Sequence, residues 1–439
     1  MIGFVGLSHL GLIYSLATAA KGFDVVAYNH DGTLTAQCAA GKFPIDEPGF
    51  SELFDEHRAR IRYTSDETAL AECELVFYSL DVRTNERNES DLGALTALIR
   101  ATAPKLSPGT IAVILSQVSP GYMRQLRTEL RELSPADFYY QVETLIFGRA
   151  VERAMQPERF MVGAYDRARS LPVPLQAWHA AFKCPVLVMG LESAELAKIA
   201  INLFLVSTVA TTNTLAEICE AIGADWNEIV PALQLDRRIG PHAYLKPGLG
   251  IGGGNLERDL VTVQSLAARH GTEAGIVTAW QRNSRHRRDW AIRQIERAFP
   301  SKEHQAVLAV WGFAYKVDTH STKNSPSIEL MRALRRHRIR AHDPAAQIDA
   351  VEFPHVTIFS SPLAAAEGAD ALLVMTPWSS YASLPVKELR KVLRGRIIID
   401  PYAILDEAQC RDVGFEYQRL GNRTFPKMVR KNADDGTAL

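Results

Sequence analysis

Apolar runs of four or five residues alternate with segments of helical periodicity in the first part of the chain. Turn residues bound the runs, as is typical of buried strands. Strands that alternate with helices in this way predict a doubly wound parallel sheet. The predicted strands are Ile2–Val5, Asp24–Tyr28, Leu75–Ser79, Ile111–Leu115 and Phe138–Gln141, with Met161–Gly163 and Val186–Val188 as further candidates.

The middle of the chain has a different pattern. Residues Ser193–Ile222 contain no Pro or Gly, and their apolar positions recur at helical spacing. A helix of about 30 residues is about 45 Å long, which is long enough to link two domains. Gly223 is the predicted stop, and further helices are expected up to about Phe299.

Strand and helix patterns alternate again from Ala306, which predicts a second α/β domain. The expected fold class is therefore α/β, with two Rossmann-like doubly wound domains joined by a central helical domain with a long helix. The expected domains are 1–192, 193–300 and 301–439, with a frayed polar tail at Lys431–Leu439. The predicted strands of the last domain are Val307–Trp311, Arg340–Asp343, Val356–Phe359, Ala371–Met375 and Ile397–Asp400.

The composition of the chain is that of an ordinary globular protein. The 439 residues are 47% hydrophobic and 23% charged, and the net charge of −1 favours neither nucleic acid nor an acidic membrane. The five cysteines are scattered without metal-type spacing, so we expect reduced thiols that mostly fill the core and no metal site. We expect no signal peptide, because the N-terminal residues lead directly into a predicted strand, and no apolar run reaches the about 18 residues that a membrane span needs. These features indicate a cytoplasmic protein.

The first strand is followed by a candidate nucleotide turn, Gly6-Leu7-Ser8-His9-Leu10-Gly11. Ser8 occupies the position of the second Gly in the dinucleotide-binding motif G-x-G-x-x-G. The free N–H groups and the dipole of the following helix would bind a pyrophosphate. The alternative is a tight strand–helix turn without a ligand. Asn29 follows the second strand, where NAD enzymes carry an acid for the ribose hydroxyls. Because no Arg lies beside it, NAD is favoured over NADP.

A glycine-rich stretch, Gly248–Asp259, lets the backbone approach a ligand closely. It resembles the signature loop of the UDP-glucose/GDP-mannose dehydrogenase family, roughly GFGGSCFPKD. In that family the Cys is the nucleophile that carries the covalent intermediate. Asn255 occupies its position here, and Gly254, Leu256, Glu257 and Arg258 also differ from the family loop. A carboxamide cannot replace a thiolate in covalent catalysis.

The resemblance covers nearly the full length, in segments that keep the family's order. Ser116–Gly121 resembles STVPPG, with Gln117 in place of a Thr, and Gln141–Leu145 resembles NPEFL and keeps Glu143. Pro157–Gly163 resembles HPDRIVIG, and Ala194–Leu205 resembles AELIKYAANAFL. Three further segments match: Arg238–His242 before the glycine loop, Gly312–Lys316 with Ser325–Ser327 (GLAFKP…RESPS), and Asp400–Ala403, which replaces D-x-R-N.

The resemblance implies roles for individual residues. The implied catalytic residues are Lys198, Asn202, Asp259, Glu143 and Asn255. The implied cofactor contacts are Gly6, Ser8, His9, Leu10, Gly11, Asn29, Ser116, Gln117 and Lys323, the last in place of an Arg. The implied substrate contacts are Lys198, Asn202, Gly250, Gly252, Gly253, Lys316 and Tyr402, the last in place of an Arg associated with the sugar nucleotide.

These roles have structural alternatives. Lys198 and Asn202 are four residues apart and share a helix face, so they are either catalytic or a solvated pair. Asp259 would hold, with Lys198, the water that takes the alcohol proton, or it would only interact with the helix dipole. Glu143 would activate water or orient the substrate, and its alternative is a structural acid at a strand end.

The resulting interpretation is an NAD-dependent dehydrogenase that acts on a nucleotide sugar between its two α/β domains. Because Asn255 replaces the nucleophile, a single hydride transfer to an aldehyde or ketone is expected. The alternatives are oxidation to the acid without a thioester, a non-sugar substrate in a specialised biosynthetic pathway, and a non-catalytic nucleotide-binding paralogue. The long helix resembles the family's dimerisation element, so a homodimer is expected.

Overall fold

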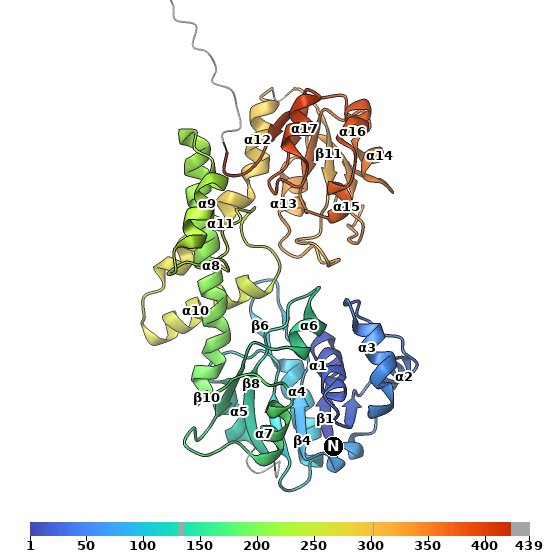
Figure 1. Ribbon diagram of the computed structural model, residues 1–439, viewed down its shortest axis with the longest axis vertical. Helices are drawn as coiled ribbons and strands as arrows, with labels where there is room; N and C mark the ends of the chain where they lie inside the picture. The colour runs from blue at the N-terminus through green and yellow to red at the C-terminus, as the bar shows by residue number, and fades with distance from the viewer. Residues whose placement is uncertain (131–135, 302, 423–439) are drawn as a thin grey trace, which may run out of the picture. The chain divides into compact units, whose positions relative to one another are not determined.

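The computed structural model describes residues 1–130, 136–301 and 303–422 (Figure 1). The chain forms two compact units, Met1–Leu203 and Phe204–Leu439. The expected tail at Lys431–Leu439 lies outside the described residues. Each unit contains one large sheet, so the α/β class with two doubly wound sheets and a long central helix is confirmed.

An eight-stranded sheet forms the centre of the N-terminal unit, in the order β10-β9-β8-β7-β4-β1-β2-β3. Every predicted strand is present, with bounds that differ by at most two residues. The strands are β1 (Ile2–Val5), β2 (Val25–Tyr28), β3 (Ile61–Thr64), β4 (Leu75–Tyr78), β7 (Ile111–Ile114), β8 (Asp137–Val142), β9 (Phe160–Ala164) and β10 (Val186–Gly190).

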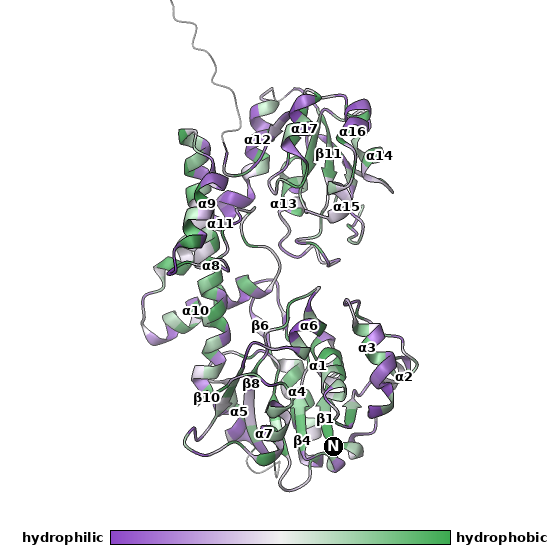
Figure 2. Ribbon diagram, in the orientation of Figure 1, coloured by the Kyte–Doolittle hydropathy of each residue, from purple (hydrophilic) through white to green (hydrophobic). Residues whose placement is uncertain are grey.

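Helices cover both faces of this sheet because successive strand residues point to opposite sides. Phe4 and Phe77 belong to one buried cluster, whereas Val5 and Tyr78 belong to the other. Both faces of the sheet therefore carry a hydrophobic cluster, and the ribbon of its central strands has the hydrophobic colour in Figure 2. The helices are α1 (His9–Ala20), α2 (Gly32–Ala39), α3 (Phe50–His57), α4 (Gly93–Thr102), α5 (Tyr122–Leu130), α6 (Ala150–Met155) and α7 (Val173–Ala180).

The sheet differs from the prediction in two respects. It is not wholly parallel, because β9 runs antiparallel to β8, so a prediction of uniform strand direction was wrong at this pair. The edge strand β3 was not predicted, nor were β5 (Arg83–Thr84) and β6 (Ser90–Asp91), which form a separate two-stranded antiparallel sheet. Only Ile61 of β3 is buried, so this edge strand lacks the apolar run that marks its neighbours.

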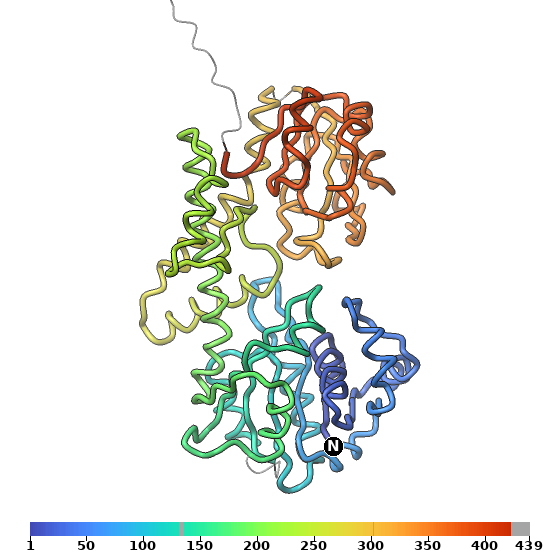
Figure 3. The backbone as a smooth tube through the Cα atoms, in the orientation of Figure 1, coloured from blue at the N-terminus to red at the C-terminus, as the bar shows by residue number. Residues whose placement is uncertain are grey.

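The predicted long helix is confirmed as α8 (Leu191–Ile222), and Gly223 follows it with a positive φ of 84°. Figure 3 follows the backbone from α8 into α9 (Trp226–Leu235) and then through α10 (Asn255–His270), α11 (Gly275–Arg288) and α12 (Trp290–Ala298). The helical region thus ends one residue before the expected Phe299.

The second sheet has six strands, all parallel, in the order β13-β12-β11-β14-β15-β16. Its last strand was not predicted. The strands are β11 (Val307–Trp311), β12 (Arg338–His342), β13 (Val356–Ile358), β14 (Ala371–Val374), β15 (Ile397–Ile399) and β16 (Glu416–Gln418). The helices are α13 (Pro326–Ala333), α14 (Pro362–Ala366), α15 (Ser379–Ala382), α16 (Val386–Val392) and α17 (Glu407–Asp412).

Among the described residues, α8 is the one helix long and apolar enough to cross a membrane by length and composition. Its mean hydropathy is 1.5 over the most apolar window. The sequence prediction considered only uninterrupted apolar runs and missed it. A core helix meets the same criterion, so this observation is weak evidence for a membrane span.

Candidate functional site

The candidate nucleotide turn connects β1 to α1. Ser8 precedes α1, whose first residues are His9 and Leu10. A Cβ on Gly11 would lie 2.0 Å from the carbonyl oxygen of Gly6, so only Gly permits this close approach of helix and strand. Tight packing of this kind at the start of a helix fits the pyrophosphate of a dinucleotide.

An acid that the sequence prediction missed lies beside this turn. The Oδ2 of Asp81 is 3.5 Å from the backbone N of Leu10. The Ser8 hydroxyl links the two segments: it accepts from the Asp81 N–H at 2.8 Å and donates to the Ser79 carbonyl at 3.0 Å. The Asp81 carboxylate therefore lies at the start of α1, where a pyrophosphate is expected to bind, and burial raises its pKa. The 71 residues between Asp81 and Leu10 hide this contact in the sequence.

His9 has a buried partner on another segment. Its Nε2 is 2.8 Å from Oε1 of Glu47, whose side chain is 2% exposed. Glu47 also accepts from the N–H groups of Gly148 and Ala150, at 3.0 and 3.1 Å. This carboxylate thus connects the start of α1 to the start of α6.

Asn29, the residue expected to bind the ribose, already accepts a hydrogen bond within the protein. Asn29 is buried, and its Oδ1 accepts from the Asp31 N–H at 2.9 Å. At the end of β7, Ser116 is fully buried and its hydroxyl donates to the Tyr78 carbonyl at 3.3 Å. Gln117 follows it and is half-buried. These predicted cofactor residues all follow strands of one sheet, at the edge where ligands bind in such folds.

Lys198 and Glu143 form a pair. Lys198 Nζ lies 3.5 Å from Glu143 Oε1, and the two side chains are 14% and 17% exposed. The second carboxylate oxygen of Glu143 accepts from the Leu145 N–H at 2.7 Å. Asn202, one turn further along α8, is 8% exposed. A sheltered ammonium beside a carboxylate is able to stabilise a developing alkoxide.

A further acid on α8 holds the loop before α5. Glu195 is fully buried and accepts from the N–H groups of Gly121 and Met123, at 2.6 and 2.7 Å. Burial raises the pKa of Glu195, although these two N–H groups act in the opposite direction. Glu195 thus fixes the segment that contains Gln117 to the helix that carries Lys198.

In the second unit, the glycine loop rests on α8 and α11. The Gly248 N–H donates to Asn213 Oδ1 at 2.9 Å, and the Ile251 N–H donates to Ser284 Oγ at 2.8 Å. Gly250 lies against Ser284, and Gly252 and Gly253 lie against Tyr315. The predicted substrate glycines are therefore gathered in one loop with a fixed backbone.

The loop leads directly into α10. Asn255 is the first residue of this helix and is exposed. Asp259 is one turn further on and is 1% exposed, with Arg258 Nε at 3.3 Å from its Oδ1. Lys316 lies with its Nζ 5.9 Å from the centre of the Tyr315 ring, and Lys323 is half-buried.

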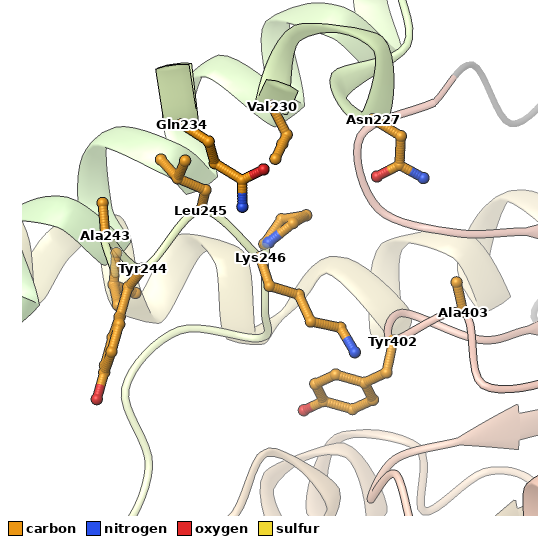
Figure 4. Close-up of a pocket in the computed structure, with 11 residues that line it drawn as sticks. Asn227, Val230, Gln234, Ala243, Tyr244, Leu245, Lys246, Tyr402 and Ala403 are labelled. Carbon is orange, nitrogen blue, oxygen red and sulfur yellow. The ribbon is translucent and has the colours of Figure 1, made fainter. Parts of the chain in front are cut away.

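The second unit also contains a pocket of about 610 Å³, within the size range of small-molecule sites. Figure 4 shows Lys246 extending toward the ring of Tyr402, with Gln234 and Asn227 from α9 on the walls. Of these residues the sequence prediction named only Tyr402. The others lie far from Tyr402 in sequence, so no local pattern connects them to it.

The chain is similar to known proteins over most of its length. Three models of the UDP-glucose/GDP-mannose dehydrogenase family match the chain: the NAD binding domain at residues 1–181, the central domain at 192–285 and the UDP binding domain at 309–407. The UDP-glucose 6-dehydrogenase of Pseudomonas aeruginosa is 28% identical to this chain. The alignment covers 95% of this chain and 96% of that protein.

Solved structures resemble the chain over its full length as well. A UDP-glucose dehydrogenase from Pyrobaculum islandicum superposes with a TM-score of 0.82 at 25% identity, covering 95% of this chain and 96% of that one. A UDP-D-ManNAc dehydrogenase from Pyrococcus horikoshii has the same TM-score at 22% identity, covering 96% and 99%, and shows the fold alone. The protein thus belongs to the UDP-glucose/GDP-mannose dehydrogenase family, and it is an NAD-dependent dehydrogenase.

Proposed function

We propose that this dehydrogenase oxidises one alcohol of a nucleotide sugar by a single hydride transfer and releases the aldehyde or ketone. The observation that carries the proposal is Asn255, at the position where the family loop has its nucleophilic Cys. An amide forms no thioester, so the second oxidation of the family reaction lacks its covalent intermediate.

The cysteines of the chain supply no substitute for the missing nucleophile. Four of the five are buried, and Cys184 is partly buried. Burial raises the pKa of all five thiols, to about 11 for Cys38 and Cys73 and to about 12 for Cys410. A thiol in such surroundings is a poor source of thiolate at neutral pH.

The first oxidation keeps its residues. We propose that the Lys198 ammonium, held beside Glu143, stabilises the alkoxide as the substrate alcohol loses its proton through water. Asn202, one turn further along the same helix, would extend this proton path. NAD, when bound at the Gly6–Gly11 turn, supplies the hydride acceptor. The balance is one alcohol and one NAD consumed, with one carbonyl product, one NADH and one proton formed.

We propose that the pocket at Tyr402 holds the nucleotide part of the substrate. The Tyr402 ring offers a stacking face for a base, and Lys246 offers a cation for the phosphates. The UDP binding domain model, at residues 309–407, includes Tyr402 and supports this assignment. The three family models also support a functional division near 1–192, 193–300 and 301–439.

The experiment that tests the proposal is a product balance. The full chain is incubated with UDP-glucose, GDP-mannose or a UDP-N-acetylhexosamine and NAD, and NADH and product mass are followed together. One NADH per substrate and a carbonyl product, trapped by a hydrazine reagent, are expected. An acid with a second NADH per substrate would refute the single-step reaction.

Two variants test the proposed roles of Lys198 and Asn255. Lys198→Met is expected to lower kcat at least a hundredfold, because the charge that acts on the transition state is lost, whereas the exposed Lys391→Met serves as the matched control. Asn255→Cys is expected to yield some acid. Turnover unchanged by Lys198→Met would argue against the assigned mechanism, and failure to bind NAD would favour a non-catalytic paralogue.

A further inference from the structure

The glycine loop is bound to the segment Tyr315–Asn324 through both polar groups of Gly253. Its N–H donates to the Lys323 carbonyl at 3.1 Å, and its carbonyl accepts from Asn324 Nδ2 at 2.7 Å. A Cβ on Gly253 would lie 2.6 Å from Cε2 of Tyr315, so the loop backbone rests directly on that ring. The peptide of Gly253 is therefore fixed from two sides.

The same amide of Asn324 reaches the helix that follows the loop. Asn324 Nδ2 also donates to Oε2 of Glu257, the third residue of α10 and two residues after Asn255. An amide nitrogen carries two hydrogens, and here one is directed to Gly253 and the other to Glu257. Asn324 has a φ of 53°, a left-handed conformation that Asn tolerates better than most residues.

Glu257 is a partly sheltered acid with cations nearby. Burial raises its pKa, whereas the bond from Asn324 and the charges of Arg288, Lys323 and Arg285 act in the opposite direction. The family segments quoted above place a Pro at position 257 and an acid at position 324. In this chain the acid is on the helix and the amide is on the facing segment, and the two side chains are hydrogen-bonded.

We propose that Asn324 and Glu257 form a latch that positions the glycine loop and Asn255 for the substrate. Both are positioning residues: they act through the backbone of Gly253 and the first turn of α10. The inference rests on the proposed function only in taking Asn255 to face the substrate. The hydrogen bonds of the latch, rather than the charge of Glu257, are the feature that matters.

The test compares variants that break the latch with one that keeps it. Glu257→Ala and Asn324→Ala remove the bonds, and Glu257→Gln keeps an acceptor oxygen for the Asn324 amide. Hydrogen exchange of the backbone in residues 248–254 is measured by mass spectrometry, together with kcat and KM for the nucleotide sugar. Glu296→Ala, an exposed acid on α12, is the matched control.

Both alanine variants are expected to speed exchange in the loop about tenfold, because each loses at least one hydrogen bond that restrains it. The value of kcat/KM for the nucleotide sugar should fall by about the same factor, while KM for NAD stays within about twofold of wild type. Glu257→Gln should restore both properties. The double variant should be no worse than Asn324→Ala, because both act on one contact.

Loop exchange that is unchanged in both alanine variants would refute the latch. So would a Glu257→Gln variant as impaired as Glu257→Ala, because charge would then be the decisive property. Thermal unfolding identifies an alanine variant that fails to fold. In that case loop exchange and kcat/KM of Glu257→Gln are compared with those of the wild type, and impairment of this variant would refute the latch. Absence of turnover in the wild-type protein would count against the proposed function, whereas the exchange measurement still decides the latch.

Discussion

At the scale of single residues, contacts between distant segments decide how the predicted positions are used. Asp81 is the clearest case, because its carboxylate lies 3.5 Å from the Leu10 N–H at the start of α1. A helix start favours an anion, and here the protein already provides one. Binding of a pyrophosphate at this turn must therefore displace or tolerate the Asp81 charge.

We predict that Asp81→Asn tightens NAD binding about three- to tenfold. Removal of a like charge beside the phosphate is worth about 1 kcal/mol, and tenfold in affinity corresponds to about 1.4 kcal/mol. Calorimetric titration with NAD measures the change, and high salt should reduce it. Asp24→Asn, an exposed acid before β2, is the control. Weaker NAD binding would instead indicate that Asp81 accepts a hydrogen bond from the cofactor.

The candidate site was predictable wherever a motif lies within one segment. The Gly6–Gly11 turn, the Lys198–Asn202 spacing and the glycine loop are of this kind. Asp81, Lys246 and the Asn324–Glu257 pair were not predictable, since each acts on a residue that folding brings near. Asn324 and Gly253, for example, are separated by 71 residues. No periodicity or spacing rule connects such positions.

At the scale of elements, burial explains which strands the sequence predicts. Strands β1, β2, β4 and β7 have every residue buried and were found from their apolar runs. The edge strand β3 and the two-residue strands β5 and β6 have few buried positions and were missed. The antiparallel direction of β9 depends on its connection to β8, which hydrophobic pattern does not report.

Helix α7 contains a buried titratable group on the sheet face. His179 is 3% exposed, its Nε2 is 2.7 Å from Gln141 Oε1, and its ring packs against Phe160. Burial lowers the pKa of His179 to about 4, from an ordinary value of 6.5. The folded chain therefore keeps this imidazole neutral at a pH where the unfolded chain protonates it.

We predict that the free energy of unfolding falls as pH drops from about 6.5 toward about 4. The unfolded chain binds more protons across this window, so stability is complete above it and is lost within it. The loss is about 3.5 kcal/mol at most, at about 1.4 kcal/mol for each pKa unit. Urea unfolding followed by circular dichroism at several pH values measures it. In His179→Gln the free energy of unfolding should depend less on pH across this window. His30→Gln, which changes an exposed histidine, is the control and should keep the pH dependence of the wild type. If the free energy of unfolding depended on pH equally in the wild type and both variants, His179 would not be the source of the pH dependence.

At the scale of the whole molecule, α8 leaves a row of apolar side chains exposed in the second unit. Phe204 is 76% exposed, Ile222 is 70% exposed, and Leu215 and Ile218 are 41% and 46% exposed. Leu235 on α9 is 84% exposed. Large apolar side chains grouped on one helix are typical of an interface between protein chains. We propose that this face forms the homodimer that the sequence led us to expect.

We predict that Ile218→Glu combined with Ile222→Glu converts a dimer to a monomer. The two residues are four apart on α8 and share a face, so a symmetric interface would bring the introduced charges into a desolvated contact. Sedimentation equilibrium at micromolar concentration measures the mass. Val351→Glu, an 87% exposed apolar residue elsewhere in the same unit, is the matched control and should stay dimeric. A monomeric wild-type protein, or a double variant that remains a dimer, would show that this face is not the interface.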